Sequence, residues 1–454
     1  MYRFVSTLIL CIASAPAWAT DAADPARGLD LLLNRAYVPV AFDQQTFDDV
    51  WRSWEEPLRS QAEQADDAER RRLAYERYGL IERADDPQHR PMQYVVDADG
   101  NWSMNCFGCH QGTVAGQMIP GAPNAQFALE TLTHDIRNAK LRLGKRMTDL
   151  DIGSMVMPLG TTVGTTNAVM FGVALMHYRD DDLNIRSDRF PPPMTHHDHD
   201  APAWWNTSRK QRLYSDNFAP RGHRGLMQFI ASKENGPEKF RDWEDDFRHI
   251  EAYIDSLEPP EYPFEVNDSL AERGRLIFEQ NCAECHGTYG ENGSYPERIV
   301  PIDVVATDSV RLGSLTAKHR LSYETNWINE YGARGKVVAE PGGYLAPPLD
   351  GVWASAPYFH NGSVPTLWHV LRPTERPVVW VRTHNDAYDR KLVGLACDAS
   401  EDLPSRTTSA TTSAAVRRRY FDTRKFGKSA RGHDFAESLS DDACQAVLEY
   451  LKTL

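Results

Sequence analysis

Apolar side chains recur every three or four residues in several segments of this 454-residue chain, which is the spacing of an amphipathic helix. Ser269 and Glu272 predict a capping box at the start of one such segment, and Ser440 or Asp441 is expected to begin the last. Signals for strands are few by comparison. We therefore predict a mainly α fold with long loops and little β structure, in which helices cover 47–54, 73–78, 129–147, 243–257, 270–282 and 443–451.

Two stretches rich in turn-forming residues divide the chain. Residues 94–102 surround Asp99-Gly100 and predict a short β-hairpin. The proline-rich segment 258–263 stops the helix before it and predicts a stiff linker. These breaks predict a signal peptide (1–19), an N-terminal helical extension (20–95), a first domain (96–260) and a second domain (264–454).

One five-residue pattern occurs in each predicted domain, as Cys106-Phe107-Gly108-Cys109-His110 and as Cys282-Ala283-Glu284-Cys285-His286. Cys-x-x-Cys-His is the attachment signature of a c-type haem. The two thiols add to the vinyl groups of the porphyrin, and the adjacent imidazole becomes the proximal ligand of the iron. A redox dithiol or half of a zinc site would need only the cysteines. Because both copies carry the histidine, we expect two cytochrome c-like haem domains in tandem with two covalently bound haem c groups. Bound calcium is compatible with the sequence but not indicated by it.

The two predicted domains end alike. Tyr253-Ile254-Asp255-Ser256-Leu257 and Tyr450-Leu451-Lys452-Thr453-Leu454 each close a helix, which indicates a faint internal repeat. The domains begin differently, because the first motif follows the predicted hairpin and the second follows a helix. We expect different tasks for the two haems.

The N-terminus has the three parts of a secretory signal: a basic residue, Arg3; an apolar run, 4–15; and a small-x-small site, Ala17-Trp18-Ala19. The apolar run is too short for a membrane span, which argues against an anchor. A chain with c-type haems is then expected in a bacterial periplasm or secreted. The formal net charge of −14 argues against a nucleic-acid partner and predicts a basic patch on any redox partner protein.

The seven cysteines divide into three groups. Cys11 leaves with the signal peptide, and four cysteines belong to the haem motifs. Cys397 and Cys444 remain as an even pair in an oxidising compartment, so we predict a disulfide between them. Two free buried thiols are the alternative.

The ligand opposite each proximal histidine decides what a haem can do. Two strong axial ligands favour electron transfer, whereas an open or weakly filled sixth position binds dioxygen or peroxide. His433 is predicted to ligate the second iron, because it precedes the last helix and no methionine follows Met227. In the first domain the position that corresponds to His433 is Gly236, which cannot ligate. His223 is the remaining candidate: if it binds, both haems are closed, and if it does not, the first haem is the reactive one.

Other side chains are candidates for roles around the haems. Trp204 and Trp205 cannot both face one core if the chain is extended, so one of them, with Phe218 nearby, is predicted to line the first haem pocket or to lie between the haems. Core packing is the alternative. His196-His197-Asp198-His199-Asp200 has the residue types of a metal site, but it follows three prolines, and we expect a solvated loop. His134 and His177 are expected at the surface or near haem propionates.

Two further stretches carry a family resemblance. They are Ala356-Pro357-Tyr358-Phe359-His360-Asn361-Gly362-Ser363-Val364-Pro365-Thr366-Leu367, and residues 420–435. With the two haem motifs, over roughly 100–454, they resemble the rubber-oxygenase-like branch of the bacterial di-haem cytochrome c peroxidase superfamily. Local chemistry alone predicts a turn at Asn361-Gly362, an N-cap at Ser363 and a helix start at Pro365. It leaves Tyr358 and His360 unexplained, and the resemblance would place both near the second haem.

The resemblance implies a division of labour between the haems. The C-terminal haem, closed by His286 and His433, would relay or store electrons. The N-terminal haem, with His110 as its proximal ligand, would bind dioxygen or peroxide in an apolar and aromatic pocket. We therefore predict a haem-dependent oxidoreductase, peroxidase- or oxygenase-like, that acts on a small or oligomeric organic substrate or with a redox partner protein. The alternative is an electron-transfer cytochrome with both haems six-coordinate; a purely structural use of two haems is the least expected.

Overall fold

The computed structural model of the chain describes residues 22–190, 192, 195–329, 336–385, 387–409 and 411–454. The predicted signal peptide therefore lies outside the described residues. Helices account for 41% of the chain and strands for 12%, which confirms the mainly α prediction. Every sheet in the described ranges has only two or three strands. No described helix is both long and apolar enough to reach across a bilayer.

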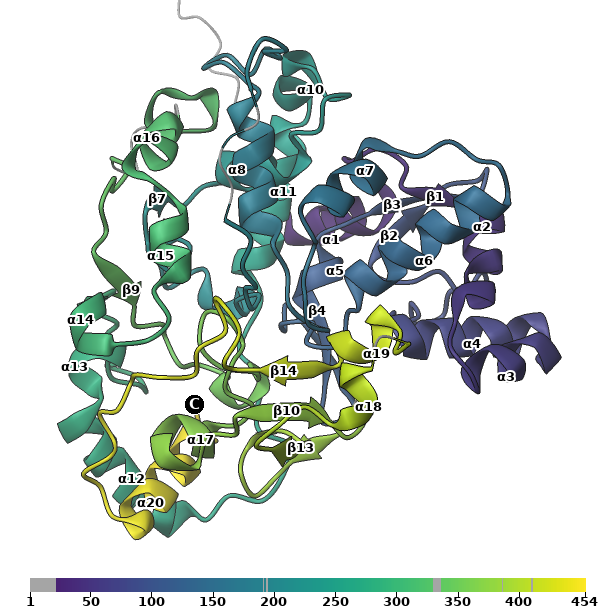
Figure 1. The fold of residues 1–454 in the computed structure, drawn as a ribbon. Helices are drawn as coiled ribbons and strands as arrows, with labels where there is room; N and C mark the ends of the chain where they lie inside the picture. The colour runs from purple at the N-terminus through teal and green to yellow at the C-terminus, as the bar shows by residue number, and fades with distance from the viewer. Residues whose placement is uncertain (1–21, 191, 193–194, 330–335, 386, 410) are drawn as a thin grey trace, which may run out of the picture.

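The N-terminal part of the chain surrounds a three-stranded sheet of order β1-β3-β2 and one long helix, α6 (Figure 1). The predicted hairpin at 94–102 is confirmed, because Tyr94 pairs with Met104 and Gly100 takes a φ of 77° in the turn. The elements are α1 (Pro25–Asn34), β1 (Phe42–Asp43), α2 (Gln44–Asp49), η1 (Val50–Ser53), α3 (Leu58–Gln64), α4 (Asp67–Tyr78), β2 (Tyr94–Val96), β3 (Asn101–Met104), α5 (Phe107–His110), β4 (Gln111–Val114), β5 (Gln117–Pro120), α6 (Leu129–Arg142) and α7 (Asp149–Val156).

The aromatic side chains of the N-terminal extension form a core of their own against α6 and the hairpin. Phe47 stacks on Trp102 with ring centroids 4.5 Å apart. The indole N–H of Trp54 donates to the hydroxyl of the buried Tyr78 over 2.9 Å. The predicted helices at 47–54 and 73–78 therefore pack on the first domain, and their aromatics serve the core.

The middle of the chain contributes α8 (Ala168–His177), η2 (Trp204–Asn206), β6 (Arg212–Leu213), β7 (Ala219–Pro220), α9 (His223–Leu226), η3 (Met227–Ile230), α10 (Pro237–Asp242) and α11 (Glu244–Asp255). The C-terminal part follows with α12 (Asp268–Asn281), α13 (Ala283–His286), β8 (Ile299–Pro301), α14 (Ile302–Val305), α15 (Val310–Ser314), α16 (Ala317–Thr325), η4 (Trp327–Asn329), β9 (Gly343–Leu345), η6 (Val352–Ala354), α17 (Leu367–Leu371), η7 (Pro373–Glu375), β10 (Val379–Arg382), β11 (Tyr388–Asp389), β12 (Gly394–Leu395), β13 (Cys397–Ser400), α18 (Ser405–Thr408), α19 (Ala414–Arg418), β14 (Tyr420–Asp422) and α20 (Asp441–Leu451).

Caps were predicted for the helix before the second motif, α12, and for the last helix, α20. The predicted capping box at Ser269 is wrong, because α12 begins two residues earlier than predicted and Asn267 accepts the N–H of Leu270 over 3.1 Å. The Ser269 hydroxyl instead donates to the Asn267 side chain. The prediction for the last helix is confirmed, since Ser440 caps α20 by accepting from the N–H of Ala443.

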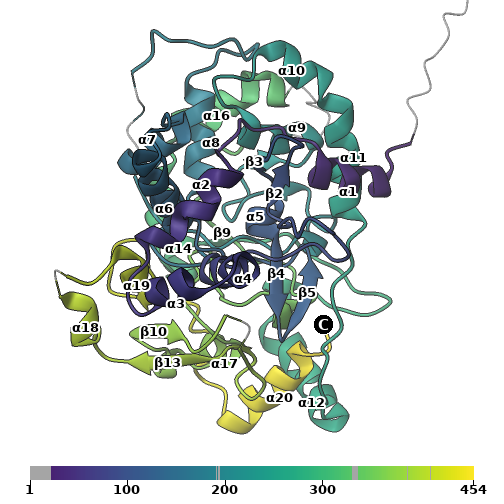
Figure 2. The same cartoon turned by 90° about the vertical axis from the view of Figure 1, so that its right-hand side faces the viewer.

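Two helix pairs cross in the same way, α1 with α11 and α12 with α20 (Figures 1 and 2). A Cβ on Gly28 would overlap the carbonyl oxygen of His249 and lie 2.8 Å from Cβ of Tyr253. A Cβ on Gly274 would overlap the carbonyl oxygen of Ala446 and lie 3.0 Å from Cβ of Tyr450. The blocked carbonyl precedes the tyrosine by four residues in both pairs, so the repeat at the two tyrosines extends to the helices that they meet.

The first motif directly follows the hairpin and the second directly follows a helix, as predicted, but the crossing of α1 with α11 shows that the first half of the chain also has the matching helix. α1 is the counterpart of α12, but β1 to β3 and the helices α2 to α4 lie between it and the first haem motif. Because the insertion separates the helix from the motif along the chain, local pattern alone did not connect them.

The hydrophobic cores do not follow the predicted boundary near residue 264. Tyr323 and Trp327, from the C-terminal half, belong to the core around the first motif. Ile119 and Trp205, from the N-terminal half, belong to the core around the second motif. The two halves of the chain therefore exchange segments, and the domain limits stay a prediction.

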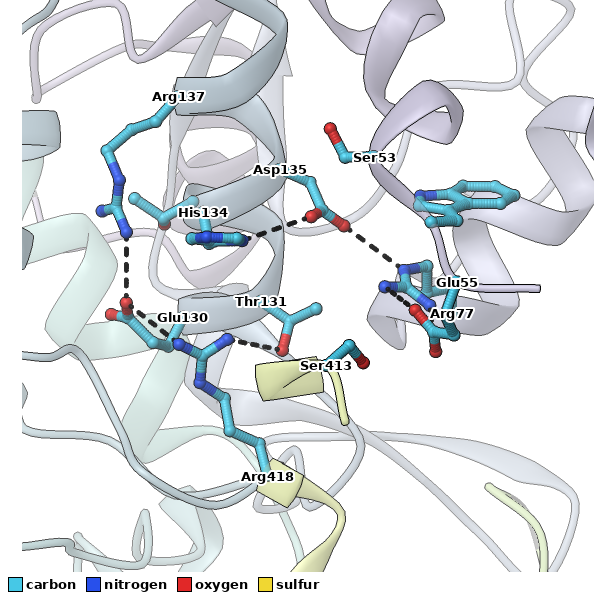
Figure 3. A network of polar contacts seen from close by, with 12 residues as sticks. Ser53, Glu55, Arg77, Glu130, Thr131, His134, Asp135, Arg137, Ser413 and Arg418 are labelled. Carbon is cyan, nitrogen blue, oxygen red and sulfur yellow. Dashed lines mark hydrogen bonds and ion pairs between the residues drawn. The ribbon is translucent and has the colours of Figure 1, made fainter. Parts of the chain in front are cut away.

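A polar network also joins the two halves (Figure 3). Arg418 of α19 lies 3.7 Å from the carboxylate of Glu130 and donates to the hydroxyl of Thr131, both on α6. On the next turn of α6, Asp135 pairs with Arg77 of α4 over 3.3 Å. Both carboxylates are buried, so the network holds three helices of distant sequence at fixed positions.

Candidate haem-binding sites

Each Cys-x-x-Cys-His motif forms a single helical turn, α5 in the first half and α13 in the second. The N–H of His110 donates to the carbonyl of Cys106 over 3.2 Å, and the N–H of His286 donates to that of Cys282 over 3.0 Å. One tight turn therefore carries both thiols and the imidazole, which is the local geometry that haem attachment requires.

The environment of the thiols disfavours the alternative interpretations of the motif. Burial raises the pKa of Cys106 to about 12, that of Cys109 to about 11 and that of Cys282 to about 12. A reactive dithiol needs a lowered thiol pKa. Within the described ranges, no three metal-binding side chains are arranged to hold an ion. The residues fit thioether bonds to a haem better than redox or zinc chemistry.

Both proximal histidines are held by the same kind of contact. Nδ1 of His110 lies 3.1 Å from the carbonyl oxygen of Pro202, and Nδ1 of His286 lies 2.9 Å from that of Pro347. A carbonyl oxygen can only accept, so each Nδ1 carries the proton and each Nε2 keeps a lone pair for a metal. Burial lowers the pKa of His110 to about 4 and also lowers that of His286. Both rings are therefore neutral, as ligation requires.

His433 faces His286 across a gap that fits one iron. The two ring centroids are 6.1 Å apart, with an interplanar angle of 60°. An iron between them needs a metal–nitrogen bond of roughly 2 Å on each side, and each ring centre lies roughly 1 Å behind its nitrogen, which predicts a separation of about 6 Å. Burial, and then the neighbouring His286 and Arg376, lower the pKa of His433 to about 3. The predicted pair His286–His433 is thus compatible with two axial ligands.

The loop that carries His433 is fixed by its backbone. Gly432 and His433 take φ values of 78° and 54°, and the N–H of His433 donates to the carbonyl of Val305 over 2.7 Å. The guanidinium of Arg376 donates to the carbonyls of Ala430 and Gly432, each over 2.7 Å. The role of Arg376 was not predicted, because nothing in its local sequence distinguishes it from a surface arginine.

The 356–367 stretch supports the same loop. The amide of Asn361 donates to the carbonyls of Gly427 and Ser429, and the hydroxyl of Ser363 donates to that of Ser429. The predicted turn is confirmed by Gly362, whose φ is 69°. The predicted N-cap at Ser363 and helix start at Pro365 are wrong, because Thr366 caps α17, which begins at Leu367.

Of the two residues that local chemistry left unexplained, Tyr358 is buried and His360 is half-buried. The hydroxyl of Tyr358 donates to the carbonyl of Val352 over 3.0 Å. The ring of His360 stacks on Tyr344 with centroids 4.2 Å apart, and burial lowers the pKa of His360 to about 3. Phe359, between them in the sequence, lies 6.0 Å from the ring of His433. Their predicted place near the second haem agrees with these contacts and stays a prediction.

The two adjacent tryptophans face different cores, although they lie in the 3-10 helix η2 and not in the extended segment on which the expectation was based. Trp204 stacks on His110 with centroids 4.6 Å apart and an interplanar angle of 19°. Trp205 packs in the core around the second motif and donates its indole N–H to the carbonyl of Asp350 over 2.7 Å. Phe218 is buried in the core around the first motif and stacks on Tyr214 at 4.7 Å.

The segment 202–206 links the two proximal histidines. It begins at Pro202, whose carbonyl receives His110, and ends at Asn206, whose amide donates to the carbonyl of Pro348 over 3.3 Å. Pro347, the neighbour of Pro348, receives His286. A short path of peptide and hydrogen bonds therefore joins the two imidazoles.

His223 lies among carboxylates. Its Nε2 is 3.2 Å from Glu244, and its Nδ1 is 3.8 Å from Glu251. Both ring nitrogens therefore meet acidic groups, and ligation of the first iron by His223 stays a prediction. The weaker candidates have other contacts: His134 pairs with Asp135 at 3.5 Å, and Nε2 of His177 meets the carbonyl of Phe190 at 2.9 Å.

The histidine-rich segment is not the solvated loop that we expected. His197, Asp198 and His199 are buried, with exposed fractions of 2%, 1% and 6%. Asp198 explains the burial, because its carboxylate pairs with Lys428 over 2.8 Å and accepts the backbone N–H of Thr161. The compensated charge lets the segment pass through the interior.

The predicted disulfide between Cys397 and Cys444 is not formed. Both are free thiols. Cys397 lies in strand β13, where it is the partner of Arg382 in the ladder. Cys444 is buried in α20, with its sulfur 4.0 Å from the carbonyl of Ala436. Each thiol is enclosed by its own neighbours, and an even count of cysteines could not reveal this.

Comparisons with known proteins point to the same part of the chain. Residues 343–381 match the family model described as RoxA-like, cytochrome c-like. This match supports a relationship to rubber-oxygenase-like cytochromes over a small part of the chain, and haem c as a cofactor. The matched range contains the carbonyl that holds His286, the Tyr358–Ser363 motif and Arg376, which together build the second site.

Two curated proteins of Sinorhizobium fredii (strain NBRC 101917 / NGR234) are similar to the chain. "Uncharacterized protein y4iM" is 30% identical over 235 residues, which is 45% of this chain and 53% of that protein. "Uncharacterized protein y4iJ" is 26% identical over 264 residues, which is 44% of this chain and 41% of that protein. The chain spans about half the length of the curated relatives that it matches.

Proposed function

We propose that this protein is an exported di-haem c-type cytochrome oxidoreductase, with the N-terminal haem activating dioxygen or peroxide and the C-terminal haem relaying electrons. The family match supports a c-type cytochrome oxidoreductase. Two motifs with the same turn and the same proximal contact support two haems. Export to a periplasm rests on the N-terminal signal pattern and on the haem type.

The observation that carries the proposal is the difference between the two proximal histidines. His286 has His433 opposite it at the spacing of one iron. Among the residues that the structure describes, His110 has no second imidazole at such a spacing; its ring neighbour is Trp204. This asymmetry supports a closed second haem and a first haem whose sixth position is free for a small ligand.

A haem with an open sixth position binds and activates dioxygen or peroxide. The described residues contribute positioning and exclusion of water. Pro202 orients the His110 ring and keeps its proton on Nδ1, and Trp204 covers one face of that ring. Apolar side chains of the surrounding core, Met170, Val173 and Phe218 among them, are buried and would limit the access of water.

The second haem would exchange electrons with the first along the segment 202–206. The path from His110 to His286 contains two contacts at prolines and the bond from Asn206 to Pro348. The stacked Trp204 offers an aromatic step on the same segment. A redox partner protein or an organic substrate would supply or receive the electrons, and the net charge of −14 favours a basic partner surface.

The rival function is an electron-transfer cytochrome in which both haems are six-coordinate. It needs a sixth ligand for the first iron, and His223 is its candidate. The contacts of His223 with Glu244 and Glu251 favour a hydrogen-bonded structural role instead. The two functions therefore differ in one measurable property, the coordination of the first haem.

Spectroscopy of the purified protein tests the proposal. We expect two haems per chain, one of them low-spin and inert to carbon monoxide and the other able to bind it. His433→Ala should open the second haem and add a second carbon monoxide-binding species. His223→Ala and the exposed control His384→Ala should leave both spectra unchanged.

Two results would contradict the proposal. Two low-spin haems that ignore dioxygen, carbon monoxide and peroxide would leave the electron-transfer function. A His223→Ala variant that gains carbon monoxide binding at the first haem would identify His223 as its ligand.

A further inference from the structure

A cluster of basic side chains, buried except for the half-buried His360, lies between the two motifs and has no role in the proposed function. It consists of His197, His199, His360 and Arg311, and we call it the inner basic cluster. The rings of His197 and His199 meet edge to face with centroids 4.3 Å apart. Arg311 is 2% exposed and pairs with Asp216.

Two atoms of the inner basic cluster lack partners. Nε2 of His197 and Nε2 of His199 are buried, and neither makes a hydrogen bond with a described residue. A buried polar atom without a partner costs roughly 1–3 kcal/mol, and two adjacent ones in an ordered interior indicate a ligand that completes them.

The chemistry of the cluster selects the ligand. Nδ1 of His197 meets the carbonyl of Thr195 over 2.8 Å, so this nitrogen carries the proton and Nε2 accepts. His199 is free to donate from Nε2. Burial and then Arg311 lower the pKa of His199, so its ring is neutral, and Arg311 is already paired with Asp216. The two unpartnered nitrogens therefore offer one donor and one acceptor, which a carboxyl group complements. A metal is disfavoured, since the described part of the chain shows no trio of ligands placed for one.

The position of the cluster indicates which molecule supplies the carboxyl group. The backbones of His199 and Thr166 exchange hydrogen bonds of 2.9 Å, and the hydroxyl of Thr166 meets the thiol of Cys109 in the first motif. On the other side, His360 follows Phe359, whose ring faces His433. The cluster therefore lies between the thioether edge of one site and the distal ligand of the other.

We propose that the inner basic cluster binds a propionate carboxyl group of one of the two haems. This inference rests on the proposed function, because the haem supplies the carboxyl. His199 donates to one oxygen, and the other oxygen shares a proton with Nε2 of His197. The proton moves between oxygen and nitrogen, and both orphaned atoms are satisfied whichever atom holds it.

The test uses the holoprotein and its variants His197→Leu and His199→Leu, with His384→Leu as the exposed control. Leucine fills a similar volume but removes the polar atom. If a carboxyl group is bound, we expect the midpoint potential of one haem to fall, because the group loses a hydrogen bond that offsets its negative charge. The propionate band in the resonance Raman spectrum of that haem should shift, and the melting temperature of the variant should fall. The haem whose signals move is the source of the carboxyl.

The contrary result is equally clear. If the imidazoles have no ligand, each leucine removes one unsatisfied atom, and stability should stay equal or rise while both potentials stay unchanged. A crystal structure of the wild-type holoprotein decides the case if a variant fails to fold: no haem oxygen within hydrogen-bond distance of either Nε2 would overturn the inference. A pyridine haemochrome assay with fewer than two haems per chain would instead contradict the proposed function.

Discussion

Gly28→Ala tests the crossing of α1 with α11, which the sequence did not reveal. The added Cβ would overlap the carbonyl oxygen of His249, and a Cβ essentially never approaches another heavy atom within 3.0 Å. A backbone carbonyl inside a helix cannot rotate away, so the two helices must separate. Overpacking of this kind costs about 3 kcal/mol at its upper end. Alanine returns about 1 kcal/mol through its helix propensity, which leaves a net loss of about 2 kcal/mol.

Thermal unfolding measures this loss. For a domain of about 150–250 residues, a loss of about 2 kcal/mol lowers the melting temperature by about 4–8 °C. Gly274→Ala, at the matching crossing of α12 with α20, should lose a similar amount. Gly313→Ala is the control, because a Cβ there meets nothing within 4 Å and only the gain in helix propensity remains.

The two variants should also differ in the haem that they disturb. Gly28→Ala should change the carbon monoxide-binding spectrum of the first haem, and Gly274→Ala the low-spin spectrum of the second. If Gly28→Ala proves as stable as Gly313→Ala, α1 does not pack on α11 as described, and the equivalence of the two helix pairs fails.

Three further outcomes are expected. Burial would raise the pKa of Asp198, but His196, Lys428 and the N–H of Thr161 hold it far below its usual range. The ionised Asp198 therefore stabilises the folded protein at neutral pH, and this contribution is lost as the pH falls below about 4. Asp198→Asn should cost about 3 kcal/mol at neutral pH, and parallel acid-unfolding curves for variant and wild type would contradict this. Arg376→Lys keeps the charge but loses the planar guanidinium that donates to the carbonyls of Ala430 and Gly432. The low-spin spectrum of the second haem should therefore change while that of the first stays constant. An unaltered spectrum of the second haem would show that Arg376 does not hold the His433 loop. Unfolded, unreduced protein should show two alkylatable thiols, Cys397 and Cys444. An intact mass without alkylation would instead show that the two cysteines form a disulfide.

Local pattern was sufficient for the features that depend on neighbours in the chain. The two haem motifs, the hairpin at 94–102, the final helix with its Ser440 cap and the closing tyrosines follow from spacing and turn chemistry over fewer than twenty residues. The caps predicted at Ser269 and Ser363 are wrong because another side chain nearby caps each helix, Asn267 by accepting from the N–H of Leu270 and Thr366 by accepting from that of His369.

The choice of His433 also came from sequence, since its place before the last helix and the lack of later methionines left few rivals. Its geometry came from tertiary structure. Only the fold places Val305 and Arg376 on the loop and sets the ring 6.1 Å from that of His286. These contacts join residues far apart in the chain, and their pairing has no local signature.

The sequence by itself determined which groups the chain can offer to a cofactor: the thiols and imidazoles that predict two haem c groups, and a set of amphipathic helices to enclose them. Tertiary structure alone decided how the parts are shared. In the fold, α1 packs on α11 although an insertion separates it from the first motif, and Trp204 and Trp205 lie in two different cores. The segment around Asp198 is buried because Asp198 pairs with Lys428. The physical reason is common to all three: burial and charge compensation depend on which distant residues meet, and that is a property of the folded chain.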